Sequence, residues 1–295
     1  MESKRDQNRI TAVLGTSDLD DSTTIRVYAD ATTRGLYAKV VSTFPDLLYA
    51  TDPALEISAG EKVLLSRISH VNKFGRNPDI AIGVREEIWE GSVAYVYPTT
   101  ATITHIRSAV NSADTRGKTI EIQGLDASWN LVVQTKDTNA ANSTTEVELD
   151  TPLIRVFRMK VLENVVLDQN IWIGATGVNA NLTKAIIVAG NNQTLMAIYT
   201  IPNGKTGYLT NWYASVNPAS NLDPTSMPIS VWARDNDNGY EKQVKHVTGL
   251  ISGHVQHNYK PYNKFTQKTD IFMTATPVGK AADVSGGFDI ILVDN

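Results

Sequence analysis

Histidine is the residue type in this chain best suited to metal binding or to proton transfer near neutral pH. The sequence contains five histidines, of which only His254 and His257 lie close together; the others are His70, His105 and His246. On an extended strand, residues three positions apart face opposite ways, so the two neighbouring rings would not converge on one metal ion. No carboxylate lies beside them to complete a ligand set. The pattern favours a pair of turn or subunit-contact histidines over metal ligands.

Alternating Asp and Asn residues between Asp235 and Gly239 suggest a second chemistry, because calcium prefers oxygen ligands at alternate positions. The EF-hand pattern fails here: its obligatory glycine would be Tyr240 and its bidentate glutamate would be His246. An isolated loop of this kind can still hold calcium weakly. A plain hairpin turn is the favoured interpretation, since Asp and Asn stabilise turns through their own main chain.

The acidic cluster of Glu86, Glu87 and Glu90 beside Trp89 resembles the paired carboxylates of glycosidases. Adjacent residues on a strand point to opposite faces, so Glu86 and Glu87 cannot both flank one glycosidic bond. We therefore expect this cluster to be a solvated strand end.

Other catalytic signatures are missing from the sequence. It has no cysteine, no Gly-x-Ser-x-Gly elbow, no P-loop and no Gly-x-Gly-x-x-Gly fingerprint. The five tryptophans are dispersed, which suits core anchors better than a sugar-stacking platform or a track for single-stranded nucleic acid. We therefore predict no catalytic, cofactor-binding or metal-ligating residues, no cofactor, and a protein that is not an enzyme.

Charge and hydropathy exclude further classes. The chain has 27 Lys and Arg against 31 Asp and Glu, a formal net charge of -4, which argues against direct binding of nucleic acid through its phosphates. Apolar runs are only a few residues long, so membrane insertion is not expected. The first nine residues are polar and charged, unlike a secretory signal. We expect a soluble protein made in a cytosol.

The elements that must position any site are predicted to be strands, because 81 of the 295 residues are Val, Ile or Thr. We predict an all-β fold with an extended N-terminal arm, residues 1–55, and two antiparallel β-sandwich, jelly-roll-like units, residues 56–166 and 167–295. The arm offers strand-like pieces at 10–14, 24–28 and 35–43, too few for their own core, so they must pair with something else. Strands in the two units are expected at 92–97, 101–110, 119–125, 131–135, 145–149, 154–162, 194–201, 206–216 and 240–247.

Three details of this strand pattern can be tested. Residues 74–78, Phe-Gly-Arg-Asn-Pro, are expected to form a turn. Asn203-Gly204 between two alternating runs predicts a hairpin. The last strand, 288–293, is apolar on both faces, which predicts that its own second sheet covers one face and another subunit the other.

Several stretches resemble virion proteins of tailed phages, especially those of marine and cyanobacterial hosts. The stretches are residues 5–15, 27–33, 120–127 with Trp129 and Asn130, 189–206, and 287–293. They touch most of the chain, but they are turn-and-strand signatures rather than chemical motifs, and the acidic segment 18–22 departs from the more glycine-rich stretch expected there. The resemblance implies a particle component without saying which one.

Three functions remain open. The favoured one is a non-catalytic structural protein of a virion, made in the host cytoplasm, that serves as capsid decoration or as a head–tail or tail exterior part. Its partners would be other copies of itself, as a trimer or higher ring, and other virion proteins. The alternatives are an adhesin that binds a host surface or carbohydrate, favoured by exposed aromatics beside Asp/Asn loops, and a polysaccharide-degrading enzyme, which needs two convergent carboxylates.

Overall fold

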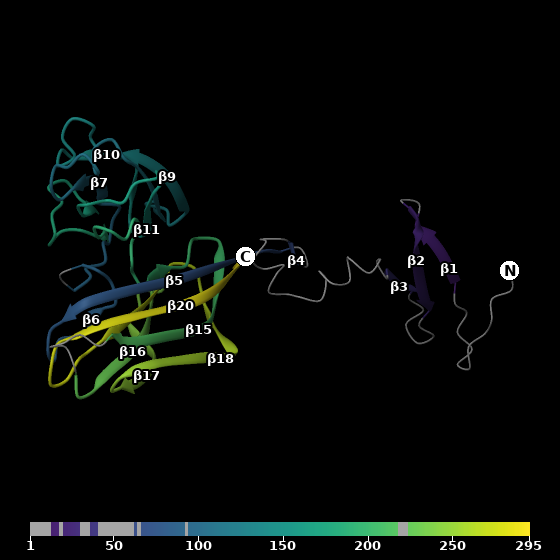
Figure 1. Ribbon diagram of the computed structural model, residues 1–295. Coiled ribbons are helices and arrows are strands. Elements are labelled where there is room, and N and C mark those ends of the chain that lie inside the picture. Colours follow the sequence, from purple (N-terminus) through teal and green to yellow (C-terminus); the bar gives the residue numbers. More distant parts are fainter. Residues whose placement is uncertain are drawn as a thin grey trace. The chain divides into compact units, whose positions relative to one another are not determined.

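The computed structural model describes residues 13–17, 20–29, 36–40, 62–63, 66–91, 94–217 and 224–295, with side chains from residue 68 onward. All regular elements within these ranges are strands, joined in antiparallel pairs (Figure 1). The predicted all-β class is therefore confirmed for the described residues. The chain divides into two compact units, residues 1–67 and 68–295, which are described separately.

No helix in the described part of the chain is long and apolar enough to cross a membrane.

In the first unit, β1 (Val13–Ser17), β2 (Asp20–Ala29) and β3 (Leu36–Val40) form one antiparallel sheet in that order. These strands overlap the three pieces expected in the arm, and they pair with one another. A short strand, β4 (Lys62–Val63), pairs with the beginning of β5 (Ser66–Ile80). The rest of the expected arm lies outside the described residues.

The second unit contains two groups of sheets. The first lobe, residues 94–197, has a sheet with the order β10-β7-β12-β13 and another with the order β11-β8-β9. Its isoleucine-rich core includes the fully buried Ile106, Ile122 and Ile173. The strands are β7 (Ile103–Ser108), β8 (Thr119–Leu125), β9 (Leu131–Asp137), β10 (Val147–Leu153), β11 (Arg155–Val161), β12 (Ile171–Gly174) and β13 (Ala185–Ile187).

The second lobe combines residues 68–91 with residues 198–295. One sheet has the order β14-β19-β16-β17, with β6 (Glu86–Glu87) paired to β19, and the other has the order β18-β15-β20-β5. The remaining strands are β14 (Ile198–Thr200), β15 (Lys205–Asn217), β16 (Met227–Asp235), β17 (Gln243–Leu250), β18 (Gly253–Phe265), β19 (Thr269–Ala275) and β20 (Ala282–Asp294).

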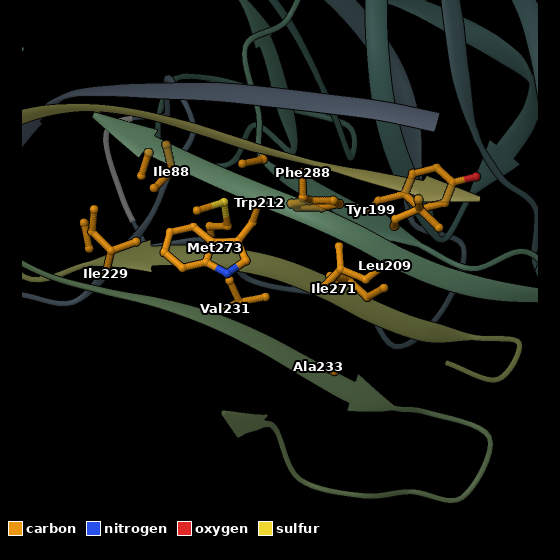
Figure 2. Packing of buried hydrophobic residues seen from close by; sticks show 14 of the residues in the cluster. Ile88, Tyr199, Leu209, Trp212, Ile229, Val231, Ala233, Ile271, Met273 and Phe288 are labelled. Atoms are coloured by element: carbon orange, nitrogen blue, oxygen red, sulfur yellow. The ribbon is translucent and has the colours of Figure 1, made fainter. Parts of the chain in front are cut away.

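Side chains from both sheets of the second lobe meet in one core (Figure 2). Val231 and Met273 come from one sheet, and Trp212, Phe288 and Leu209 from the other. Trp212 is 1% exposed and Phe288 is fully buried. Burial of such a side chain contributes about 1.5–3 kcal/mol relative to leaving it in water, so these large residues hold the two sheets together.

The strand pairings do not follow the expected boundaries at 56 and 167. β12 follows residue 167 in the sequence, but it pairs with β7 in the first lobe. β5 lies near the beginning of the second unit, but it pairs along most of its length with the C-terminal strand β20 (Figure 1). The first lobe is thus inserted between β5–β6 and the rest of the second lobe, an arrangement that strand spacing along the sequence does not reveal.

The prediction of a turn at residues 74–78 is wrong, because β5 continues through these residues. Gly75 lets the strand approach another backbone closely: a Cβ there would lie 2.2 Å from the carbonyl oxygen of Ile88. Pro78 lies where the pairing of β5 with β20 is irregular, between Ala282 and Val284. A strand tolerates proline at such an irregularity, where the ladder does not need its missing N–H.

The hairpin expected at Asn203-Gly204 is wrong in its pairing. A turn is present, with Gly204 at a φ of +73°. The strand before it, β14, pairs with β19, whereas the strand after it, β15, pairs with β18 and β20 in the other sheet. Asn-Gly reverses the chain direction, but burial of both strands in the common core determines their partners.

The C-terminal strand has the expected two apolar faces. Phe288, Ile290 and Leu292 are buried in the core, while Ile291 and Val293 on the opposite face are half-buried. β20 lies between β15 and β5, so both of its edges are paired. Coverage of its outer face by another subunit stays a prediction.

Candidate functional site

A groove opens at the end of the second lobe where β16, β17 and β18 come together, and its volume is about 240 Å³. We call it the Tyr240 groove, after the most exposed aromatic residue in its wall. Its floor is buried, and its rim carries charged and polar side chains. The lining residues are Ala233, Asp235, Tyr240, Glu241, Gln243, Lys245, Lys264, Phe265, Thr266 and Thr269.

The segment from Asp235 to Gly239 forms the turn between β16 and β17 and lies at one end of this groove. Asp235 Oδ1 accepts hydrogen bonds from the backbone N–H groups of Asp237 at 3.0 Å and Asn238 at 3.1 Å. Its Oδ2 accepts hydrogen bonds from Asn238 Nδ2 at 2.8 Å and Thr266 Oγ1 at 3.2 Å. The Asp235 carboxylate thus stabilises the turn, as the hairpin interpretation of this segment predicted.

Asp237, the other carboxylate of the turn, also has partners in the chain. Lys268 Nζ lies 2.7 Å from its Oδ1, and Gln267 Nε2 donates to its Oδ2 at 3.1 Å. The hydrogen bond from Lys268, followed by that from Gln267, lowers the pKa of the Asp237 carboxyl. These contacts join the β16–β17 turn to the segment before β19 and fix one end of the groove.

The lining of the groove carries two lysines, Lys245 and Lys264, and two carboxylates, Asp235 and Glu241. Lys245 and Lys264 form no ion pair within the described ranges 68–91, 94–217 and 224–295. Lys245 Nζ donates to Gln243 Oε1 at 3.0 Å and keeps further hydrogen atoms to donate. Glu241 is the one rim carboxylate besides the engaged Asp235. The groove is therefore suited to bind a ligand rather than to transfer protons between two carboxylates.

Histidines form a second cluster at the open side of the same lobe, where the edge strands β17 and β18 face each other. The rings of His246 and His257 lie 4.3 Å apart between centroids, and Trp212 lies 4.9 Å from His246. Tyr259 approaches His257 edge-on at 4.7 Å. Burial, followed by the charge of His257, lowers the pKa of His246. The charged form of His246 is therefore disfavoured in this packed contact.

The other histidines lie elsewhere. His254 is exposed and on the face opposite His257, as the strand pattern predicted. His70 lies 3.9 Å from Asp289. His105 Nδ1 shares a hydrogen bond with Thr104 Oγ1 at 2.8 Å. No group of three or more His, Asp or Glu residues is placed to hold a metal ion within the side chains that the structure describes.

The acidic cluster is not the solvated strand end that we expected. Glu87 is only 7% exposed, and its Oε2 accepts a hydrogen bond from the backbone N–H of Tyr95 at 3.0 Å. Burial raises the pKa of Glu87. Glu86 accepts from Asn77, and Glu90 accepts from Asn191. Each carboxylate has its own partner, so the three do not converge on one ligand.

A buried lysine is a further unusual group. Lys73 on β5 is 4% exposed, and its Nζ donates to the carbonyl oxygen of Phe157 on β11 at 2.5 Å. Burial, followed by the positive charge of Arg158, lowers the pKa of Lys73 to about 7. It joins the two lobes and faces no cavity among those described, so we assign it a structural role.

Sequence reasoning missed both the groove and the histidine pair. The groove combines residues near 240 with residues near 265, which are brought together by the return of β18 along the edge of the lobe. His246 and His257 come from two strands that belong to different sheets. The alternation of Val255, His257 and Tyr259 with polar residues was a usable signal in the sequence, because on a strand it places His257 and Tyr259 on one face.

No family model matches the chain, and no curated protein matches it.

Proposed function

We propose that the chain is a non-catalytic structural component of a tailed-phage virion, a capsid decoration protein or a part of the head–tail junction or tail exterior. In this proposal its two lobes are β-sandwich, jelly-roll-like units, and it assembles with copies of itself, as a trimer or higher ring, and with other virion proteins. The resemblance of several stretches to tailed-phage virion proteins supports this role. The particle would be its final location, after synthesis in the host cytoplasm.

The observation that carries the proposal is an exposed apolar sheet edge. β9 lies at the end of its sheet among the described pairings. β9 exposes Leu131 and Val133, which are 49% and 57% exposed. An edge strand offers unpaired N–H and C=O groups, and a monomeric protein normally protects such an edge with charge, proline or a short length. Exposed apolar side chains on the edge favour a second chain as its cover.

The junction between the lobes supports the same role, because a structural subunit of a particle must keep its two lobes in a fixed relative position. The side chains of Arg155 in the first lobe and Asp270 in the second are almost fully buried and joined by two hydrogen bonds. Trp129 and Tyr97 pack on the Arg155 guanidinium, with ring centroids 4.8 Å and 5.4 Å away. Such a charged and aromatic cluster favours one fixed arrangement of the lobes.

A specific observation also favours the second candidate, an adhesin on the particle. Tyr240 is 56% exposed beside the Asp235–Gly239 turn, at one end of the second lobe. An exposed aromatic next to an Asp/Asn loop favours a module that binds a host surface or carbohydrate. The two functions are compatible, since a tail exterior protein can both assemble and bind a host surface.

Assembly can be tested with the purified full chain by analytical ultracentrifugation at micromolar concentration. We expect an oligomer, and we expect Val133→Lys on the edge of β9 to weaken it. Val110→Lys is the matched control, because Val110 is 53% exposed but lies outside the strands. A monomeric wild-type protein, together with absence of the chain from electron-microscopy maps of intact particles, would overturn the proposal.

A further inference from the structure

The edge strands β17 and β18 lie on the open side of the second lobe, but they belong to different sheets and are not paired with each other. Among the described pairings, β17 pairs only with β16, and β18 pairs only with β15. Between these two strands the sheets are therefore held together by side-chain contacts. A ligand that binds a side chain from each strand would join the two sheets at this edge.

His246 from β17 and His257 from β18 meet at this edge. The centroids of their rings are 4.3 Å apart, and the ring planes are inclined at 42°. Trp212, which is 1% exposed, packs behind them, with ring centroids 4.9 Å from His246 and 6.2 Å from His257. Both histidines are half-buried. The pair therefore lies against the core but remains accessible from solvent.

The ring nitrogens of this pair are not engaged by other side chains. In the part of the chain described with side chains, His246 and His257 contact each other, Trp212 and Tyr259 through their rings, and they form no hydrogen bond or ion pair. His105, in contrast, shares a hydrogen bond with a threonine hydroxyl. A neutral imidazole has one nitrogen that can accept a proton or bind a metal, so two such nitrogens are available here.

Paired imidazoles select the class of ligand. Zn²⁺, Cu²⁺, Ni²⁺ and Co²⁺ bind imidazole nitrogen well, whereas Ca²⁺ and Mg²⁺ prefer oxygen. With a Zn–N distance of about 2.0–2.1 Å, each ring centroid lies about 3 Å from the ion, so two rings on one tetrahedral ion lie roughly 5 Å apart. The separation between His246 and His257 is 4.3 Å, so only small rotations of the two half-buried side chains are needed to reach this arrangement.

We propose that His246 and His257 together bind one divalent transition-metal ion of the zinc class between β17 and β18. No third His, Asp or Glu side chain among the described residues is placed to complete the site. Water therefore fills the remaining positions of the ion, and the affinity is moderate. Because the two rings come together only in the folded chain, the ion stabilises the folded state and joins the two sheets. This site is independent of assembly, so its failure would leave the structural role standing.

The test uses the full chain, treated with EDTA and dialysed, and Zn²⁺ as the probe. Isothermal titration calorimetry should show one Zn²⁺ per chain with a micromolar Kd, and no binding of Mg²⁺. His246→Phe and His257→Phe keep an aromatic ring against Trp212, and each should weaken Zn²⁺ binding at least about tenfold. His254→Phe is the matched control, because its ring is exposed on the other face of β18, and it should leave the Kd unchanged.

Two further measurements separate loss of a ligand from disturbed packing. Zn²⁺ should raise the thermal unfolding midpoint of wild type and of His254→Phe, but not of His246→Phe. In NMR spectra of the wild-type chain, Zn²⁺ should shift the imidazole signals of His246 and His257 and leave those of His254 in place. The proposal is overturned if Zn²⁺ shows no saturable binding, or if it shifts other histidines instead of this pair. It is also overturned if both phenylalanine variants of the pair bind Zn²⁺ as tightly as wild type, or if one ion binds per two chains.

Discussion

Arg155 and Asp270 are separated by 115 residues and lie in different lobes, yet two hydrogen bonds join their side chains. Arg155 Nε donates to Asp270 Oδ1 at 2.9 Å, and Arg155 Nη2 donates to Oδ2 at 3.0 Å. Arg234 binds the same carboxylate with its Nη2 at 2.6 Å, and Thr200 Oγ1 donates to Oδ1 at 2.6 Å. One buried carboxylate therefore organises two arginines at the junction of the lobes.

Replacing Asp270 with Asn should destabilise the second unit strongly. Arg155 would remain buried without its counter-charge, and breaking a buried pair in this way costs about 3–5 kcal/mol. Urea unfolding followed by tryptophan fluorescence measures the change. Asp150→Asn, which removes a carboxylate that is 68% exposed and paired with Lys136, should cost no more than about 1 kcal/mol. Equal losses of unfolding free energy in the two variants would contradict the role of Asp270 as the buried counter-charge of Arg155.

Acid should lower the stability of the protein by protonating the same carboxyl group, that of Asp270. Burial by itself would raise the pKa of Asp270, but the hydrogen bonds and charges of Arg155 and Arg234 outweigh it and lower the pKa. The stabilisation is therefore present above the usual aspartate pKa of about 3.9 and is lost as the pH falls through the lower folded-state pKa. The stability difference between wild type and Asp270→Asn should narrow as the pH falls below about 4. A constant difference down to acid unfolding would contradict this prediction.

Lys73 should also make the stability of the protein depend on pH, but here the folded state disfavours the charged form of the side chain, whereas it favours the charged form of Asp270. Its pKa is about 7 in the folded protein, because burial and then Arg158 disfavour its charged form, against 10.5 for an ordinary lysine. Between these values the unfolded chain binds more protons than the folded one, so stability from this residue rises with pH from about 7 to about 10.5.

Lys73→Met removes this titration while keeping much of the side-chain volume. The variant should gain stability relative to wild type at pH 6–7, and the gain should shrink as the pH approaches 10. Unfolding by urea at several pH values in this range measures the difference between the two proteins. A difference that does not vary with pH would show that Lys73 is an ordinary charged lysine in the folded state.

Gly75 shows why parts of the fold could not be predicted from sequence. The predicted strand at 119–125 coincides with β8, because its alternation is regular and its partners β9 and β11 are near in sequence. The turn expected around Gly75 came from its local residue types, Gly, Asn and Pro. In the folded chain, however, Gly75 is needed within a strand because backbone atoms from distant parts of the sequence approach it. Backbone atoms of Ile88 and Ala197 lie within 2.4 Å of the position that a Cβ on Gly75 would take. The Tyr240 groove was likewise hidden, because its walls come from strands of two sheets.

Gly75→Ala therefore should be one of the most damaging small substitutions in the chain. The added Cβ would lie 2.2 Å from the Ile88 carbonyl oxygen and 2.4 Å from the Ala197 nitrogen, and these backbone atoms cannot move away without disturbing their own hydrogen bond. We expect a loss of roughly 3 kcal/mol or more in unfolding free energy. Gly249→Ala, where a Cβ meets no atom within 4 Å, is the control and should change stability by less than about 0.5 kcal/mol.

His246 should make the open edge of the second lobe sensitive to mild acid. Burial and then the charge of His257 lower the pKa of His246, so the unfolded chain binds more protons than the folded one between that lowered pKa and about 6.5. Stability from His246 is therefore lost as the pH falls through this window. Protonation of His246, whose ring centroid lies 4.3 Å from that of His257, would place a positive charge in this packed contact and loosen the contact between β17 and β18. Amide hydrogen exchange should show faster opening of β17 at pH 5.5 than at pH 7.5, after correction for the intrinsic rate.

In His246→Phe, which keeps an aromatic ring against Trp212, this difference should disappear. It should persist in His254→Phe, because the His254 ring is exposed on the other face of β18. Retention of the difference in His246→Phe would show that other groups control this edge.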